Sequence, residues 1–183
     1  MEIAQAIKKR RTIHIFSKKS VPKEIIERSI VAANQAPCHK RTFPWRFTSL
    51  GINKRELLFQ LQLSLKLCEK PIDEIKYNKI KEKFLNPSHL LVASQLCSNN
   101  QLQKLEDYAA CASAIQNLSL SLVGDGVGYK WSTGKITRDA HTYQIAEIDP
   151  IEEEIIGFIW IGYGMEPSSI KRPLLNTIYR ERA

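Results

Sequence analysis

The sequence has no long hydrophobic run. No stretch approaches the roughly 18 consecutive apolar residues of a membrane-spanning helix, and no apolar segment follows the charged start as in a signal peptide. The four cysteines, at positions 38, 68, 97 and 111, form no C-x-x-C pair, and no histidine is placed to complete a zinc site. We therefore expect no membrane partner, a cytoplasmic location, and reduced thiols that mostly fill the core.

Obvious catalytic side chains are also missing. No Ser-His-Asp or Cys-His order stands out, and the acidic run Glu152–Glu154 is typical of a solvated face. Enzymes whose cofactor performs the difficult chemistry need binding and electrostatics from the protein more than a reactive side chain. The sequence therefore predicts no catalytic residue and no metal, and leaves a bound cofactor as the source of any chemistry.

Acidic residues are scarce in the first quarter of the chain. Residues 1–50 contain 11 Lys and Arg against 3 Asp and Glu, whereas residues 51–183 contain 16 of each, so the whole net charge of +8 arises at the start. A localised surplus indicates a local anionic partner. One candidate from another class is a nucleic-acid-binding module. The lack of aromatic residues spaced among the arginines disfavours it, and we expect no nucleic-acid partner.

Hydrophobic periodicity predicts helices interleaved with about three strands, and hence a single α+β domain over residues 1–183. The segment 129–133 is expected to be irregular, and 165–183 to form a tail. The expected helices are 2–9, 22 to about 37, 54–68, 72–85, 104–123 and a short one within 138–148, and the expected strands are 45–50, 90–96 and 155–163.

Two basic stretches could carry binding chemistry. Arg10, Arg11 and Thr12 offer forked and hydroxyl donors suited to a phosphate, although a solvated charge run at a helix end is the alternative. The stretch 37–45 contains two prolines, Pro37 and Pro44, and carries His39; the alternative is a rim of exposed charges. The residues before the prolines, Ala36 and Phe43, should be extended.

Glycines at 124, 126 and 128 suggest a dinucleotide fingerprint, but their spacing is G-x-G-x-G and they follow a helix. The fingerprint needs a strand before it and a helix after it. We interpret these glycines as a helix stop that lets the chain pass close to something flat.

Taken in order, these segments resemble the nitroreductase family of flavin-dependent oxidoreductases, in particular its small single-domain bacterial members. Each segment alone is weak evidence for this family, but their order over nearly the whole chain is specific for it. The segments that carry the resemblance are Arg10–Thr12, Ala32–Pro37, Pro44–Phe47, Ala114–Leu118, Gly126–Gly134 and Glu153–Tyr163.

The resemblance implies a mixed central sheet flanked by helices, and a homodimer with FMN at the subunit interface. It also implies transfer of two electrons from NAD(P)H to a small acceptor, such as a nitroaromatic or a quinone, by a ping-pong mechanism. A flavin-binding relative that stores or senses FMN without efficient turnover is the alternative.

The resemblance also implies roles for individual residues. Those implied to bind the cofactor are Arg10, Arg11, Thr12, His14, Gln35, His39, Trp131, Ser132 and Thr133, with Gln35 and His39 reaching across the dimer. Those implied to border the nicotinamide are Ser121, Leu122, Val123, Gly124, Asp125 and Gly126. Three positions depart from the family pattern: His14 stands where Arg or Lys is frequent, Phe43 where Gln is common, and Arg41 where Asn is frequent.

Overall fold

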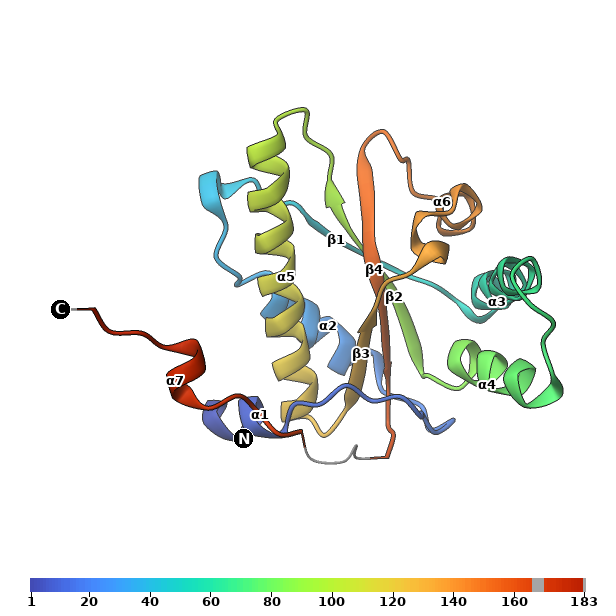
Figure 1. The fold of residues 1–183 in the computed structure, drawn as a ribbon, viewed down its shortest axis with the longest axis horizontal. Helices are drawn as coiled ribbons and strands as arrows, with labels where there is room; N and C mark the ends of the chain where they lie inside the picture. Colours follow the sequence, from blue (N-terminus) through green and yellow to red (C-terminus); the bar gives the residue numbers. More distant parts are fainter. Residues whose placement is uncertain (166–169, 183) are drawn as a thin grey trace.

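A four-stranded sheet forms the centre of the computed structural model, which describes residues 1–165 and 170–182 (Figure 1). All its neighbouring strands pair antiparallel, and an isolated bridge between Thr12 and Tyr129 adds a parallel pairing. The α+β fold class is therefore confirmed. The strand order across the sheet is β1 (Trp45–Ser49), β2 (His89–Leu96), β4 (Glu153–Gly162) and β3 (Gly128–Ser132).

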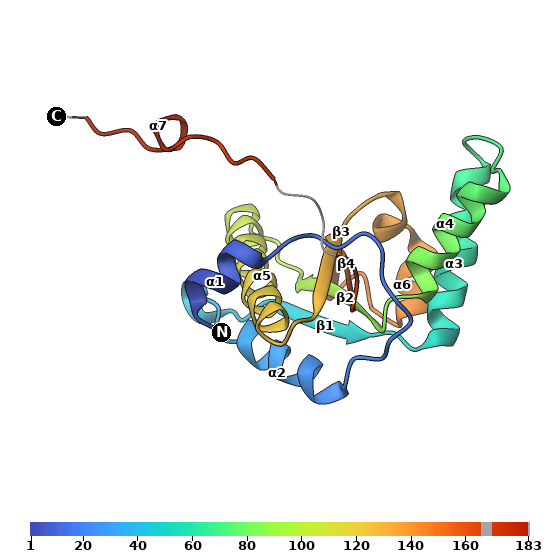
Figure 2. The same cartoon turned by 90° about the horizontal axis from the view of Figure 1, so that it is seen from below.

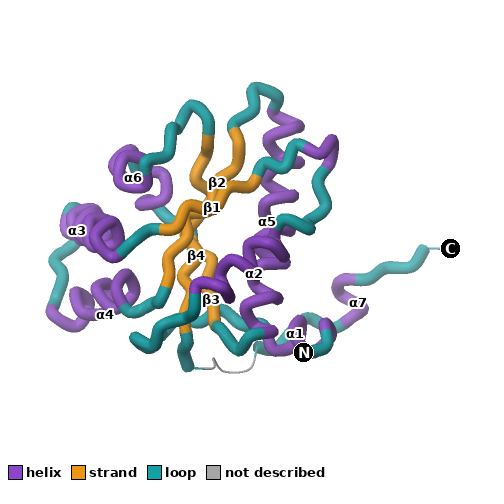
Figure 3. The backbone as a smooth tube through the Cα atoms, turned by 180° about the vertical axis from the view of Figure 1, so that it is seen from behind, coloured by secondary structure: helices purple, strands orange, loops and turns teal. Residues whose placement is uncertain are grey.

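Helices cover both faces of the sheet (Figures 1 and 3). Helices α2 (Lys23–Ala33) and α5 (Gln101–Gly124) lie on one face, and α1 (Ile3–Lys9) contacts α5. The opposite face carries α3 (Ile52–Leu67), α4 (Glu74–Leu85) and α6 (Ala140–Ala146). The short elements are the 3-10 turns η1 (His39–Arg41) and η2 (Lys135–Arg138) and the terminal helix α7 (Leu175–Ile178).

Strand β4 is buried on both faces because its sequence is apolar without alternation. Ile155 and Ile156 are less than a tenth exposed, as is every residue from Phe158 to Ile161. Trp160 is fully buried and packs edge-on against Phe84 of α4, with 5.0 Å between ring centroids. This strand thus joins the two hydrophobic layers and fixes β3 beside it.

The glycine-rich turn after α5 lets the chain reverse into β3. Helix α5 ends at Gly124, and Gly126 has a φ of 73°, which an L side chain rarely adopts. A Cβ at Gly128 would lie only 2.5 Å from Cγ1 of Ile13, so the N-terminal segment could not pack there against a larger residue. The helix-stop interpretation is confirmed, and the close neighbour at Gly128 is this aliphatic side chain.

Three sequence predictions are wrong. Residues 128–132 form β3, so the sheet has four strands where about three were expected. Phe43 is not extended but has a φ of 45°, because its backbone N–H turns to donate to Sγ of Cys38 at 3.2 Å. Only Cys111 of the four free cysteines is buried; Cys68 and Cys97 are exposed at the ends of elements.

The C-terminal segment, residues 170–182, extends away from the rest of the protein (Figure 2). Its apolar side chains contact little of their own chain: Leu174, Leu175 and Ile178 are each at least 70% exposed. In the part of the chain that the structure describes, no helix combines the length and apolar character that crossing a membrane requires.

Candidate functional site

The basic N-terminal segment lies along the open edge of β3. The backbone N–H of Ile13 donates to the carbonyl of Tyr129 at 3.0 Å, and Ile13 is buried there. Nη1 of Arg10 donates to the Tyr129 hydroxyl at 2.7 Å, with its guanidinium 5.8 Å from the ring centroid. The fold thus brings Arg10 and Thr12 next to the strand that carries Trp131 and Ser132.

Arg11 lines a cavity of about 540 Å³ beside the turn that follows α5. Its guanidinium donates to the carbonyls of Lys8 and Arg10 at 2.6 and 2.8 Å, which turns the side chain back over the segment. Lys8 and Lys9 line the same cavity together with Val123 and Gly126. Part of the predicted nicotinamide stretch therefore adjoins the basic cluster, while Asp125 forms an ion pair with Arg28 of α2 at 3.0 Å.

The side chains of β3 alternate between the two faces of the sheet. On the α5 side, the indole N–H of Trp131 donates to the carbonyl of Ile156 at 3.4 Å, and its ring lies 6.5 Å from that of Tyr108. On the α4 side, the Ser132 hydroxyl accepts a hydrogen bond from the indole N–H of Trp160 at 2.8 Å. The predicted Ser132 side chain is therefore engaged within the core, and Thr133 beyond it is exposed.

A cation that the sequence analysis did not single out lies on this α4 side. Lys83 lines a cavity of about 330 Å³ with Ser132 and Thr133, and its ammonium group is 5.4 Å from the Trp160 ring centroid. Burial, with smaller effects from Lys130 and Lys66, lowers the pKa of Lys83 to about 8. The ion pairs among the described residues do not include Lys83, since the nearby Glu69 pairs with Lys135.

Lys130 extends this group of cations toward His14. Its ammonium nitrogen lies 3.2 Å from Nδ1 of His14, and burial lowers its pKa. In the family pattern, position 14 is frequently Arg or Lys. Here the position holds a histidine, and the cation beside it is Lys130 of β3. Partly buried positive groups without acidic partners favour an anion among them.

A buried arginine fixes the end of α4, the helix that carries Lys83. Arg55 of α3 is 5% exposed, and it donates to the carbonyls of Phe84 at 2.8 Å and Pro87 at 2.6 Å. These carbonyls belong to the helix end and the following turn, where intrahelical donors are missing. The α4 sequence is rich in charged residues, and no local pattern in it distinguishes Lys83 from its exposed neighbours.

Two predicted cofactor residues lie apart from this group. Gln35 follows α2, and His39 begins η1 with Nε2 3.9 Å from a Glu106 carboxylate oxygen. In Figure 1 the loop carrying η1 lies on the other side of α5 from β3. The structure therefore brings Arg10–His14 against β3, the strand that carries Trp131 and Ser132, but does not bring Gln35 or His39 to them.

The residues present fit a flavin mononucleotide. Arg10 and Arg11 carry forked donors suited to a phosphate, and Lys83 and Lys130 supply cations on the α4 side of β3. No group of three His, Cys, Asp or Glu suited to a metal ion occurs among residues 1–165 and 170–182.

Comparison with known proteins identifies relatives over most of the chain. A family model described as the nitroreductase family matches residues 7–163. A protein of Bacillus subtilis (strain 168) that carries the provisional name NAD(P)H nitroreductase YfhC is 31% identical over 169 residues, which cover 91% of this chain and 86% of that protein.

Solved structures share the fold. A nitroreductase-like family protein from Bacillus cereus superposes with a TM-score of 0.84 at 23% identity, covering 100% of this chain and 96% of that one. A nitroreductase-type protein from Desulfovibrio desulfuricans, solved in complex with FMN, gives a TM-score of 0.76 at 20% identity and covers 100% and 98%.

The lowered pKa of Lys83 predicts a stability effect that depends on pH. Between pH 8 and 10.5 the unfolded lysine keeps the proton that the folded one has lost, so the contribution of Lys83 to the free energy of unfolding should rise with pH in this window. Lys83→Met should remove this rise and stabilise the ligand-free protein at pH 7, on the order of 1 kcal/mol after solvent screening. Urea unfolding from pH 7 to 10 measures both effects.

The matched control is Lys81→Met, which removes an exposed charge from the same helix. It should leave the pH profile of the wild type intact. Equal profiles for the wild type and Lys83→Met would show that Lys83 titrates as an ordinary surface lysine.

Proposed function

The chain belongs to the nitroreductase family, and we propose that it is an FMN-dependent oxidoreductase. It passes two electrons from NAD(P)H to a nitroaromatic or quinone by a ping-pong mechanism. A quinone, NAD(P)H and a proton give a hydroquinone and NAD(P)⁺; a nitro group gives a nitroso group and water. Bound FMN supplies the electron transfer between the two substrates.

One observation carries this proposal: the basic segment Arg10–His14 contacts Tyr129 and Lys130 of β3, the strand that continues into Trp131 and Ser132. Cations therefore lie around this strand, with Arg10 at Tyr129 and with Lys83 and Lys130 on the α4 side. Arg10 and Arg11 hold the phosphate, and Lys83 and Lys130 offset the negative charge that the ring gains on reduction. The FMN complex of the relative from Desulfovibrio desulfuricans and the NAD(P)H in the name of the Bacillus subtilis relative support the same cofactors.

The spectrum and turnover of the purified protein test this function. We expect a yellow protein that retains FMN and oxidises NADH or NADPH when a quinone or a nitroaromatic is present, with parallel lines in double-reciprocal plots. Yellow protein without turnover would support the alternative, FMN storage or sensing. Protein that stays colourless after FMN is added would contradict both.

Arg10→Ala should weaken FMN binding by about 10- to 100-fold, because it removes a charge-assisted hydrogen bond to the phosphate. Quenching of flavin fluorescence on titration of the flavin-free protein measures this affinity. Lys18→Ala is the control, since it removes an exposed cation from the segment that follows. Equal FMN affinity in the wild type and Arg10→Ala would refute the phosphate assignment.

We propose further that residues 1–183 form one domain and that two copies share each FMN. Gln35 and His39 lie apart from Arg10–Thr12 in one chain. This separation supports an FMN site shared by two subunits, because Gln35 and His39 of the partner subunit would complete it. The outstretched C-terminal segment supports it too, since its leucines are exposed in a single chain (Figure 2).

The mass in solution should be about twice the 21.0 kDa of one chain. Replacing Leu175 and Ile178 together by Asp should shift the protein toward monomer by at least about tenfold in dissociation constant, because each side chain loses its burial against the partner. Sedimentation velocity measures this change. Asn176→Asp adds a charge to the same turn and should leave the dimer intact; an FMN-loaded wild-type monomer would contradict shared sites.

A further inference from the structure

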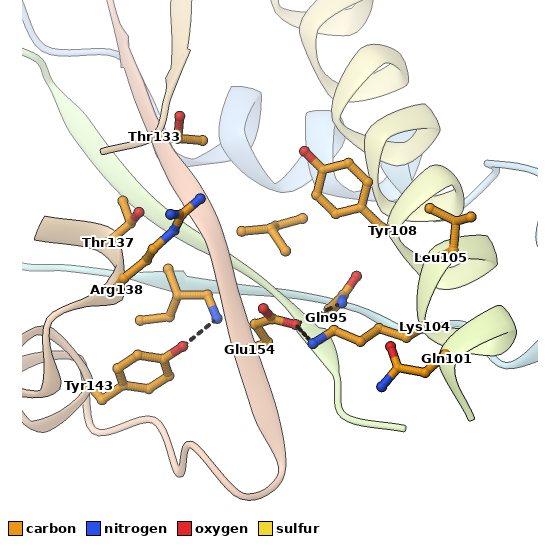
Figure 4. A pocket seen from close by; sticks show the side chains of 12 residues that line it. Gln95, Gln101, Lys104, Leu105, Tyr108, Thr133, Thr137, Arg138, Tyr143 and Glu154 are labelled. Atoms are coloured by element: carbon orange, nitrogen blue, oxygen red, sulfur yellow. Dashed lines mark hydrogen bonds and ion pairs between the residues drawn. The ribbon is translucent and has the colours of Figure 1, made fainter. Parts of the chain in front are cut away.

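A third cavity opens on the α5 side of the sheet, beside Thr133 (Figure 4). Its volume is about 710 Å³, within the range of small-molecule sites. Leu105 and Tyr108 of α5 form one wall, and Thr133, Thr137 and Arg138 form the opposite wall. None of the residues predicted from the sequence, apart from Thr133, belongs to this cavity.

The floor of the cavity is a fixed polar network. The Glu154 carboxylate accepts hydrogen bonds from Nζ of Lys104 at 2.8 Å and from Nε2 of Gln95 at 3.1 Å. The Tyr143 hydroxyl accepts a hydrogen bond from the backbone N–H of Ile155 at 3.0 Å, which fixes the adjoining side. Lys104 and Glu154 neutralise each other, so they add no net charge to the cavity.

Gln95 has an unused acceptor in this network. The side chain is 2% exposed, and its NH₂ group is turned toward Glu154. Its Oε1 atom is buried, and no donor among the described residues lies within hydrogen-bond distance of it. Because buried polar atoms are nearly always hydrogen-bonded, this oxygen suits an N–H or O–H group of a ligand.

Arg138 supplies the remaining charge of the cavity. The ion pairs among residues 1–165 and 170–182 do not include it, and the neighbouring Asp139 bonds to His141 at 2.9 Å. Tyr108 adds an aromatic wall. The lining therefore combines a cation outside the ion pairs, a buried acceptor and, in Tyr108 and Tyr143, two aromatic rings.

We propose that this cavity binds the electron acceptor, and that the acceptor is an aromatic carboxylate bearing an N–H or O–H group. The carboxylate faces Arg138, the donor faces Oε1 of Gln95, and the ring packs against Tyr108. This inference rests on the proposed function, because it is Thr133 that links the cavity to the flavin site. It assigns a substrate class to that site.

Two matched pairs of compounds test the proposal on the FMN-loaded protein. As acceptors, 4-nitrobenzoate should exceed neutral 4-nitrobenzamide in kcat/KM by about tenfold, and Arg138→Gln should abolish this preference mainly through KM. In calorimetric titrations without NAD(P)H, 3- or 4-aminobenzoate should bind more tightly than benzoate. Gln95→Met should weaken only the aminobenzoate, whereas Arg138→Gln should weaken both.

Affinity for FMN separates this proposal from its alternatives. Neither variant should change it, and Lys79→Gln, an exposed cation on α4, should change none of the measurements. Weaker FMN binding in Arg138→Gln and Gln95→Met would assign the cavity to the flavin and overturn the proposal. Equal kcat/KM for the charged and neutral acceptors would also overturn it. A protein that takes up no FMN would instead defeat the proposed function; benzoate titration of that protein would still test the cavity.

Discussion

The candidate site depends on one backbone contact, the pairing of residues 12 and 13 with Tyr129. The hydrogen bond from Ile13 to the Tyr129 carbonyl lays the basic segment along an otherwise open strand edge. Two small residues permit it: Gly126 turns the chain after α5, and Gly128 leaves room for Ile13. The positive charge at the start of the sequence thereby comes to lie next to Tyr129 of β3, although more than a hundred residues separate them in the chain.

Most of the fold could be predicted from periodicity, because α2, α5, β2 and β4 carry strong patterns of their own. Strand β3 could not. It is five residues long, begins at the third of three closely spaced glycines and contains a lysine. Its extended form comes from pairing with β4 on one side and with the N-terminal segment on the other, and strand propensity does not encode such partners.

The loop before β1 shows a second kind of failure. A residue before proline is normally extended, yet Phe43 has a φ of 45°, and Lys40 and Arg41 have φ values of 55° and 56°. Two contacts hold this loop: the Thr42 hydroxyl donates to buried Asp107 of α5 at 2.6 Å, and Sγ of Cys38 accepts from Phe43. The rule for residues before proline fails here because these hydrogen bonds, one of them to α5, fix the loop. Strained backbone of this kind is common at functional sites.

For the candidate site, the resemblance supplied the residues of the strand edge, but the sequence did not reveal Lys83. The surplus of +8 lies in residues 1–50, and the remainder of the chain is neutral overall. Nevertheless the cation with the most perturbed pKa comes from that neutral remainder, because Trp160 and Phe84 bury its stem while Lys66 and Lys130 lie nearby. Such a group destabilises the empty fold and attracts an anion for the same reason. Charge counts along the chain therefore predict the basic N-terminal part of the proposed site, whereas Lys83 stands out only through its burial in the folded protein.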